Sequence, residues 1–345
     1  MSQIVPTTMR AAVYRGVNDV RVETVGVPEI GDGEVLVKIH TGSHDAPRVF
    51  GHEMAGTIVR VGAGVEGFAV GDRVMAYHHI PCGDCYYCRK QTFAQCEVYK
   101  KVGCTAGFAP SGGGFAEYIR VMDWIVQRGL VKVPDEIPFE QAAFLEPVNT
   151  CYKAIQLLDL KSDETVLVIG QGPIGILLAA LARRTRATVL TSDLYAERHA
   201  VAAKFGLDRP IDARSDVVAV AKAATEGRGA DVALVAVGSD ALIKVAMEAI
   251  RPGGRVMLFA STQHDEAPFD PAAVCMDEKT LMGSYSASVA IQDDVTRLVF
   301  DGYRNGFDLT NLISHRFSLE DAVAAIDLAS HPQADSMKIV IQPGS

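Results

Sequence analysis

The stretch Thr165-Val-Leu-Val-Ile-Gly-Gln-Gly-Pro-Ile-Gly175, followed by Ile-Leu-Leu-Ala-Ala-Leu-Ala182, decides the fold of this chain. Its β-branched run predicts a buried strand over 165–169, and its Ala/Leu-rich run predicts a helix over 174–186. Between them, Gly170 permits a tight turn, Gly172 lets the backbone approach a pyrophosphate, and Gly175 lets helix and strand pack closely. The helix N-terminus adds N–H donors and positive potential. A flexible glycine loop would not need this order, so the stretch predicts a dinucleotide site.

The next predicted strand ends on an acidic residue. Thr188-Val-Leu-Thr-Ser-Asp193 places a carboxylate roughly 20 residues past the glycines, where the ribose of a dinucleotide is expected. A carboxylate there accepts both ribose hydroxyls of NAD and repels a 2′-phosphate, so the sequence predicts NAD over NADP. Arg198 opens an alternative, because its guanidinium could reach toward a phosphate; otherwise it stacks near the adenine or forms an ion pair on the helix surface.

The rest of the chain divides into two kinds of sequence. From about Glu146 onward, apolar strands alternate with Ala/Leu-rich helices, which predicts a parallel sheet covered by helices on both faces. Before it, short β-branched runs separated by turn residues predict a small irregular β domain, at 10–14, 20–24, 34–39 and 56–61. The tail, with a helix over 315–326 and a strand over 338–343, is too short to fold alone and must pack onto an earlier domain. We therefore predict an α/β protein with domains at 1–149 plus 290–345, and at 150–289.

Composition excludes several classes of function. The chain has 345 residues, 48% of them hydrophobic and 22% charged, and its formal charge of -9 leaves no basic surface for nucleic acid. No run is long and apolar enough to span a bilayer, and Met1–Arg10 lacks the pattern of a signal peptide. The sequence therefore predicts a cytoplasmic protein that acts on a small molecule.

Four of the seven cysteines gather in one short segment, at Cys82, Cys85, Cys88 and Cys96. Four soft ligands in one loop fit a tetrahedral zinc ion with no open position, which would be structural and not catalytic. Disulfides or an iron–sulfur site are the alternatives. The scattered cysteines, Cys104, Cys151 and Cys275, are expected to be small buried residues.

Further motifs extend along essentially the whole chain. In order they are Phe50-Gly-His-Glu-Met-Ala-Gly56, Val61-Gly-Ala-Gly-Val65, Gly71-Asp-Arg-Val74, His78-His-Ile-Pro-Cys82, Gly113-Gly-Phe-Ala-Glu-Tyr118, Leu145-Glu-Pro147 and Pro252-Gly-Gly254. Together with the cysteine segment they resemble the medium-chain zinc alcohol dehydrogenases, and most closely the sorbitol, polyol and threonine dehydrogenases. The resemblance implies a GroES-like catalytic domain, a Rossmann domain, an active site in the cleft between them, and a homotetramer or homodimer.

The resemblance also implies a catalytic zinc ion. His52 would bind it, with the carboxylates of Glu53 and Glu146 acting directly or through water, although taken alone His52 reads as a core imidazole and Glu146 as a helix-start carboxylate. The family places a further ligand, a cysteine, on a loop after the strand that matches 35–39. No cysteine lies between Met1 and Cys82 here.

Two explanations of the absent cysteine are open. Either the 345-residue sequence omits a catalytic loop, which the intact neighbouring motifs favour, or the loop is deleted. With a deletion, Ser43 and His44 are possible replacement ligands, and His52, Glu53 and Glu146 would hold zinc only weakly.

The expected function is hydride transfer between NAD and a secondary alcohol or polyol. The resemblance implies cofactor contacts at the pyrophosphate turn, at the adenosine and toward the nicotinamide, namely Pro173, Ile174, Asp193, Arg198, Phe259, Ala260, Ser261, Tyr285 and Ser286. A catalytically impaired dinucleotide-binding protein is one alternative, favoured by a true loop deletion. A zinc-independent quinone or enone reductase is another, which the cysteine segment and Asp193 argue against.

Overall fold

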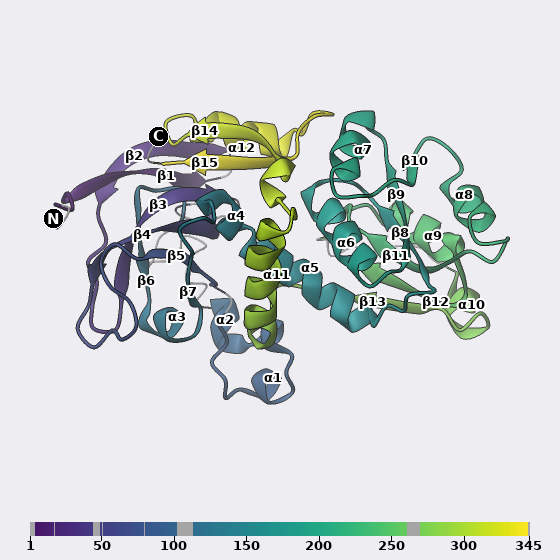
Figure 1. Ribbon diagram of the computed structural model, residues 1–345, viewed down its shortest axis with the longest axis horizontal. Coiled ribbons are helices and arrows are strands. Elements are labelled where there is room, and N and C mark those ends of the chain that lie inside the picture. Colours follow the sequence, from purple (N-terminus) through teal and green to yellow (C-terminus); the bar gives the residue numbers. More distant parts are fainter. Residues whose placement is uncertain are drawn as a thin grey trace. The chain divides into compact units, whose positions relative to one another are not determined.

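The computed structural model describes residues 4–16, 18–43, 49, 51–78, 80–101, 113–260 and 270–343. The chain forms two compact units, Met1–Asn149 with Ala287–Ser345, and Thr150–Ser286 (Figure 1). Within the described ranges, no helix combines the length and the apolar character needed to cross a membrane.

The second unit is built on a six-stranded parallel sheet, with strand order β10-β9-β8-β11-β12-β13. Its strands are β8 (Thr165–Ile169), β9 (Thr188–Asp193), β10 (Pro210–Asp212), β11 (Ala230–Val235), β12 (Ile250–Leu258) and β13 (Thr280–Gly283). Its helices are α6 (Pro173–Arg184), α7 (Ala196–Ala203), α8 (Val217–Ala223), α9 (Asp240–Ala249) and α10 (Pro271–Cys275). In Figure 1, α6 and α7 lie on one side of the strands and α8 and α9 on the other. The predicted parallel sheet with helices on both faces is confirmed.

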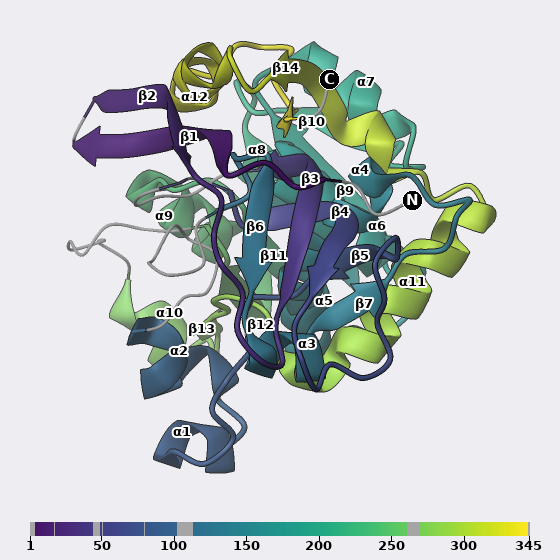
Figure 2. The same ribbon diagram turned by 90° about the vertical axis from the view of Figure 1, so that its left-hand side faces the viewer.

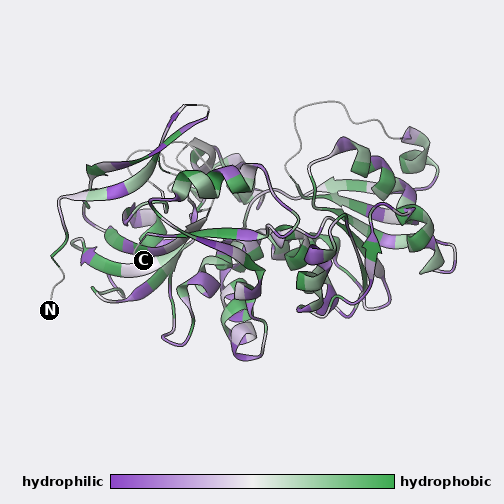
Figure 3. Ribbon diagram, turned by 90° about the horizontal axis from the view of Figure 1, so that it is seen from above, coloured by the Kyte–Doolittle hydropathy of each residue, from purple (hydrophilic) through white to green (hydrophobic). Residues whose placement is uncertain are grey.

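The strands of this sheet are buried because both of their faces are covered. Leu167, Leu234 and Val256 have no exposed surface, as expected for near-continuous apolar runs in a parallel sheet. Figure 3 shows this hydrophobic character along the strands. Strand β8 lies between β9 and β11, and the direction in which successive strands are added to the sheet reverses there. In such parallel sheets, ligands bind at the carboxyl ends of the strands beside this reversal.

The first unit is a mixed β structure. Its sheet has the order β14-β15-β3-β4-β5-β7, with β6 paired to β3, and β1 and β2 form a separate antiparallel hairpin (Figure 2). The strands are β1 (Thr8–Gly16), β2 (Asp19–Gly26), β3 (Val35–Ser43), β4 (Glu53–Val61), β5 (Arg73–Ala76), β6 (Tyr118–Val121), β7 (Leu130–Lys132), β14 (Ile313–Ser318) and β15 (Lys338–Gln342). The expected irregular β domain is confirmed.

The helices of this unit are short, apart from two. They are α1 (Tyr86–Arg89), η1 (Phe93–Gln95), α2 (Glu97–Lys101), α3 (Asp123–Arg128), α4 (Phe139–Ala143), α5 (Leu145–Leu158), η2 (Val289–Ile291), α11 (Gln292–Arg304), η3 (Leu309–Leu312) and α12 (Ala322–Ser330). Helix α5 starts in this unit and crosses into the other at Asn149/Thr150.

The C-terminal tail packs onto the sheet of the first unit, as expected, but its elements differ from the prediction. Residues 313–318 form β14 and not the start of a helix, because they pair in parallel with β15. Strand β15 in turn pairs with β3 through Ile341 and Gly42. Helix α12 follows and covers Ala12 and Phe115 with Ala322 and Ala325. The pairing with β15 thus overrides the helical pattern read from the sequence.

Candidate functional site

The glycine turn of the second unit has the geometry that its spacing predicts. Gly170 has φ +94°, a left-handed value that glycine adopts without strain. A Cβ at Gly175 would lie 1.8 Å from the carbonyl oxygen of Gly170, so a side chain there would separate helix α6 from the turn. A Cβ at Gly172 would meet nothing within 4 Å, so the backbone at the start of α6 is open to a ligand. Pro173 and Ile174 form the first turn of that helix, where N–H groups without helical partners favour a pyrophosphate.

Asp193, at the end of β9, turns back toward this glycine turn. Its carboxylate accepts hydrogen bonds from the backbone N–H of Gln171 at 2.7 Å and of Tyr195 at 3.0 Å. Arg198 lies 3.5 Å from the same carboxylate, and its guanidinium stacks on the Tyr195 ring, 4.8 Å from the ring centroid. Arg198 is therefore engaged by Asp193 and Tyr195 in this structure. The carboxylate ends β9, the position at which an acidic residue binds the ribose in dinucleotide-binding folds.

The other residues expected near the nicotinamide follow the carboxyl ends of two further strands. Phe259 and Ala260 come directly after β12, and both backbone N–H groups donate to the carbonyl of Val235, at 3.1 and 3.2 Å. Tyr285 and Ser286 follow β13, and their carbonyl oxygens accept hydrogen bonds from Lys153 at 2.8 and 3.4 Å. Parallel strands end at a common edge, so these residues share the edge of the sheet with Asp193. Ser261 lies outside the described residues.

A second cluster of chemically active side chains lies in the first unit. Ligand atoms of His52, His78 and Glu146 all lie within 4.8 Å of one another. The two imidazole rings meet edge to face, with centroids 4.8 Å apart and an interplanar angle of 70°. His78 and Glu146 are 6% and 4% exposed, whereas His52 is only partly buried, so solvent reaches the cluster mainly at His52. His78 begins one of the motifs in the sequence, but that motif did not identify it as a ligand.

The strand register explains why His78 joins His52. Strands β4 and β5 are antiparallel, with Ala55 opposite Met75 and Thr57 opposite Arg73. Continuing this register by three residues places His52 opposite His78, at the distance where cross-strand side chains touch. The signal was therefore present in the sequence, but only for a reader who already knew which strands pair.

The alternation of side chains between the two faces of a strand separates Glu53 from the cluster. Adjacent residues of a strand point to opposite faces, so Glu53 and His52 face different ways. The structure places the carboxylate of Glu53 against the ammonium group of Lys338 on β15, and both side chains are almost fully buried, at 10% and 15% exposed. Of the three residues expected to hold the catalytic ion, the structure thus brings His52 and Glu146 together and places Glu53 in an ion pair.

Glu146 is positioned by the buried first turn of α5. Leu145 and Val148 have no exposed surface, and Pro147 suits this turn, where a backbone N–H has no helical partner. One turn further on, Asn149 exchanges hydrogen bonds with the backbone of Ser288, at 3.1 and 2.8 Å. Burial raises the pKa of the nearby Tyr77, and the negative charge of Glu146 raises it further. This phenol therefore stays protonated at neutral pH.

The donor set of this cluster fits a divalent metal ion. Zinc takes imidazole and carboxylate ligands at about 2.0–2.2 Å, which puts tetrahedral ligands about 3.3–3.6 Å apart. Atoms already within 4.8 Å of one another need only small side-chain movements to reach that geometry. The full sequence has no cysteine before Cys82 to complete the set. The side chain of Ser43 and all of His44, the replacements considered above, lie outside the described residues.

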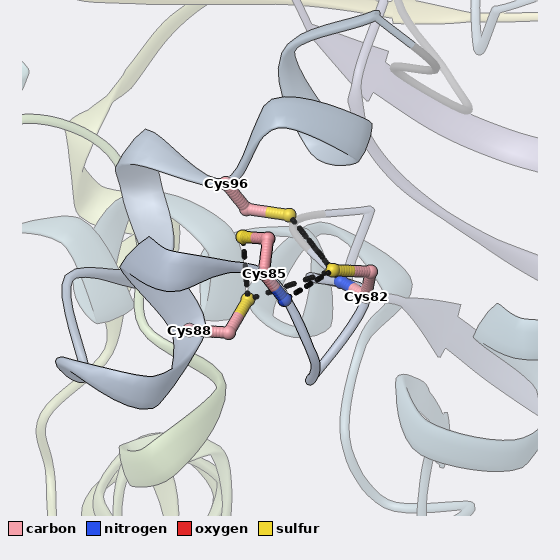
Figure 4. Close-up of side chains that lie close together, drawn as sticks. All are labelled: Cys82, Cys85, Cys88 and Cys96. Carbon is pink, nitrogen blue, oxygen red and sulfur yellow. Dashed lines mark hydrogen bonds between the residues drawn. The ribbon is translucent and has the colours of Figure 1, made fainter.

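The cysteine segment forms a separate lobe in the first unit. Helices α1 and α2 project from the sheet, and the sulfur atoms of Cys82, Cys85, Cys88 and Cys96 point toward one another (Figures 2 and 4). Three Sγ–Sγ distances measure 3.5, 3.6 and 3.8 Å. Four thiolates around zinc at about 2.3 Å would lie about 3.8 Å apart, whereas a disulfide requires about 2.05 Å. This arrangement fits the expected closed tetrahedral site and not two disulfides.

The lobe favours the thiolate form that a metal requires at Cys85, whereas burial raises the pKa of Cys88 to about 12. Backbone N–H groups of Cys85 and Tyr99 point at the sulfurs of Cys82 and Cys96, at 3.4 and 3.5 Å. A hydrogen bond from the Cys88 backbone lowers the pKa of Cys85 to about 6, so its thiolate already forms near neutral pH.

The scattered cysteines do not all behave as expected. Cys151, at the start of the second unit, is buried as predicted. The prediction for Cys275 is wrong, since this residue is exposed; the short helix α10 ends on it without covering it. Cys104 lies outside the described residues.

Comparison with known proteins identifies both parts of the chain. Residues 17–135 match the alcohol dehydrogenase GroES-like domain, and residues 173–301 match the zinc-binding dehydrogenase domain. The chain is 30% identical to an L-threonine 3-dehydrogenase of Anaeromyxobacter dehalogenans (strain 2CP-C), covering 88% of this chain and 90% of that protein. It is 27% identical to the sorbitol dehydrogenase of Bacillus subtilis (strain 168), covering 99% of each.

A solved structure supports the same relationship. A putative zinc-binding dehydrogenase from Sinorhizobium meliloti 1021, bound to NADP, superposes with a TM-score of 0.86 at 27% identity, covering 98% of this chain and 100% of that one. The GroES-like unit, the parallel nucleotide-binding sheet and the matching domains agree with the resemblance read from the motifs. This chain belongs to the zinc-type medium-chain alcohol dehydrogenase family.

Proposed function

We propose that this protein is a metal-dependent oxidoreductase that transfers hydride between NAD and a secondary alcohol or polyol. The observation that carries the proposal is that one chain holds both a dinucleotide turn and a cluster able to bind a Lewis-acidic ion. A dinucleotide turn alone would support nucleotide binding, and a metal cluster alone would equally support hydrolysis. Their combination favours metal-assisted hydride transfer.

The residues of the chain have separate tasks in this reaction. His52 and Glu146 hold the ion, and the burial of Glu146 limits access of water to one side of the site. When bound, a divalent ion supplies Lewis acidity that polarises the carbon–oxygen bond of the substrate. The backbone around Gly172 and the N-terminus of α6 bind the pyrophosphate of the cofactor, whose nicotinamide exchanges the hydride.

The choice of NAD over NADP depends on Asp193. Its buried carboxylate lies at the end of β9 and would repel a 2′-phosphate. Arg198 opposes this preference in principle, since a guanidinium pairs well with phosphate. In this structure Arg198 is already paired with Asp193 and stacked on Tyr195, and it would have to leave both to bind a phosphate. These contacts favour NAD, although the similar Sinorhizobium protein binds NADP.

The relatives support the proposed substrate class. Similar proteins are a sorbitol dehydrogenase and a threonine dehydrogenase, both of which are named for substrates with a secondary hydroxyl. We therefore propose a secondary alcohol, most simply a polyol. The two clusters that could each hold a metal ion argue against a zinc-independent quinone or enone reductase.

Steady-state kinetics test this proposal directly. With zinc present, kcat/KM is measured for sorbitol, L-threonine and 2-propanol, each with NAD and with NADP. We expect turnover of at least one of these alcohols, with kcat/KM at least tenfold higher for NAD, which corresponds to about 1.4 kcal/mol of discrimination. Equal or better turnover with NADP contradicts the cofactor assignment. NADH binding without turnover of any alcohol would instead identify a dinucleotide-binding protein.

A further inference from the structure

The geometry points to His78 as a further ligand of the metal site formed by His52 and Glu146, so that the described residues of this site offer two imidazoles, one carboxylate and no sulfur. This inference rests on the proposed function, because it assigns a residue to the same metal site. It goes beyond that function by specifying the ligand set and the chemistry that the set imposes on the ion.

Proximity and burial support His78 as a ligand. Its ring lies against His52, and a ligand atom of each of the three residues lies within 4.8 Å of the other two. His78 is 6% exposed and Glu146 4% exposed, so both groups are largely shielded from water. In such surroundings a divalent ion interacts more strongly with an imidazole and a carboxylate than it would in bulk water.

The positions of the three residues are fixed by the fold. His52 precedes β4 and His78 follows β5, and extending the antiparallel register past the strand ends places the two opposite each other. Glu146 sits in the buried first turn of α5, which Asn149 ties to Ser288. Glu146 therefore belongs to a helix, and the two histidines lie within two residues of a strand end. A site of this kind is preorganised, so little side-chain entropy opposes binding of the ion.

Sulfur is supplied elsewhere in the chain. The four clustered cysteines lie together in the lobe and are not part of the His52 cluster. Of the other cysteines that the structure describes, Cys151 and Cys275 lie in the second unit. The described residues thus provide one all-sulfur site and one site with only nitrogen and oxygen ligands.

The ligand set predicts how the ion behaves. Two histidines and a glutamate are a known catalytic zinc set that leaves a fourth position open for substrate. A site with a second neutral imidazole carries one negative charge fewer than a site with the cysteine thiolate that the family resemblance implies. The ion therefore keeps more of its positive charge and acts as a stronger Lewis acid on a bound hydroxyl. The site should also accept cobalt, nickel or iron more readily, because imidazole is a suitable ligand for these metals.

Metal content and the cobalt spectrum test the inference without relying on activity. The wild-type chain is expected to hold two ions per chain, one of them readily exchanged for Co(II). The exchanged site should show visible d–d bands without the intense near-ultraviolet band of a thiolate–cobalt bond. His78→Ala should lose this second ion, weakening its affinity by at least about 100-fold, more than the roughly 10–100-fold effect of a group that only orients a ligand.

Two further variants make the result specific. His78→Cys should bind Co(II) again and gain the near-ultraviolet thiolate band at one equivalent. His40→Phe is the matched control, because His40 lies on neighbouring β3, stacked on Phe139 at 4.6 Å and outside the cluster. It should retain two ions per chain and the wild-type spectrum. The midpoint of thermal unfolding of each variant, with the lobe zinc in place, checks that the chain is folded.

The outcomes separate this inference from the proposed function. Two ions in folded His78→Ala, or no thiolate band in His78→Cys, would overturn the role of His78 and leave the dehydrogenase proposal standing. Loss of one ion in His78→Ala, in a wild-type protein that turns over no alcohol, would support the ligand assignment and overturn the proposed reaction. A single ion per chain in the wild type would overturn both.

Discussion

Glu53 lies one residue after His52, yet its carboxylate pairs with Lys338 on β15. The ammonium group of Lys338 also lies 5.8 Å from the centroid of the Phe144 ring. The ion pair joins β4 to a strand of the C-terminal tail, about 285 residues later in the chain. A residue that the motif suggests as a metal ligand thus secures the tail to the sheet.

Removing one member of this pair should destabilise the protein. Lys338→Met removes the ammonium group that pairs with the buried Glu53 carboxylate, and breaking a buried ion pair in this way costs about 3–5 kcal/mol. Because both groups retain some exposure, we expect about 2–3 kcal/mol in urea unfolding of the zinc-loaded protein. The double variant Glu53→Gln/Lys338→Met should recover at least half of the loss. Loss of the second metal ion in Glu53→Gln alone would show instead that Glu53 binds the ion.

Two glycines of the same motif should respond in opposite ways to alanine. At Gly172, φ is -66° and a Cβ meets nothing within 4 Å, so Gly172→Ala should fold with an unchanged unfolding midpoint. Its methyl group occupies the space of the pyrophosphate, so the Kd for NADH should rise at least tenfold. Fluorescence titration with NADH measures this, and unchanged affinity would contradict the position assigned to the pyrophosphate.

Gly175→Ala is the complementary case. Its Cβ would lie 1.8 Å from the Gly170 carbonyl oxygen, which belongs to the backbone and cannot rotate away. Relieving the contact must shift α6 against the turn, at a cost of about 1–3 kcal/mol. Chemical denaturation should show this loss of stability with or without NADH, in contrast to Gly172→Ala.

The glycine turn could be predicted from sequence because its function is local. Strand, turn and helix follow one another, so the spacing of Gly170, Gly172 and Gly175 already fixes the backbone geometry. His78 could not be found in this way, because its position beside His52 depends on the pairing of β4 with β5. The tail helix predicted from residue 315 failed for a similar reason, since pairing with β15 makes residues 313–318 a strand. Contacts between distant segments are what the sequence pattern does not contain.

Asp193→Asn should shift the cofactor preference. The amide keeps an oxygen to accept from the Gln171 N–H, but it loses the charge that binds the ribose hydroxyls and repels a 2′-phosphate. A hydrogen bond to a charged group contributes about 1.5–3 kcal/mol, so kcat/KM with NAD should fall about 10–100-fold. The ratio of kcat/KM for NADP to that for NAD should rise.

The neighbouring strand supplies the control for this substitution. Asp212 ends β10 and stands opposite Asp193 in the register, but its side chain is 60% exposed. Asp212→Asn should therefore change kcat/KM with either cofactor less than twofold. An equal loss in both variants would mean that the Asp193 effect comes from altered folding of the sheet edge.

His40 predicts a component of the pH dependence of stability. Burial lowers the pKa of His40 below its ordinary 6.5, and the positive charges of Lys38 and Arg73 lower it further. In the unfolded chain His40 takes up a proton near pH 6.5, whereas the folded protein resists it, so stability falls as the pH drops through this value toward the lower folded pKa. His40→Phe preserves stacking on Phe139 and removes the titration. Urea unfolding of the zinc-loaded protein between pH 5 and 7 should therefore show that the free energy of unfolding depends less steeply on pH in the variant than in the wild type. The difference in slope should correspond to a fraction of one bound proton. Parallel slopes would mean that His40 binds its proton equally well in both states.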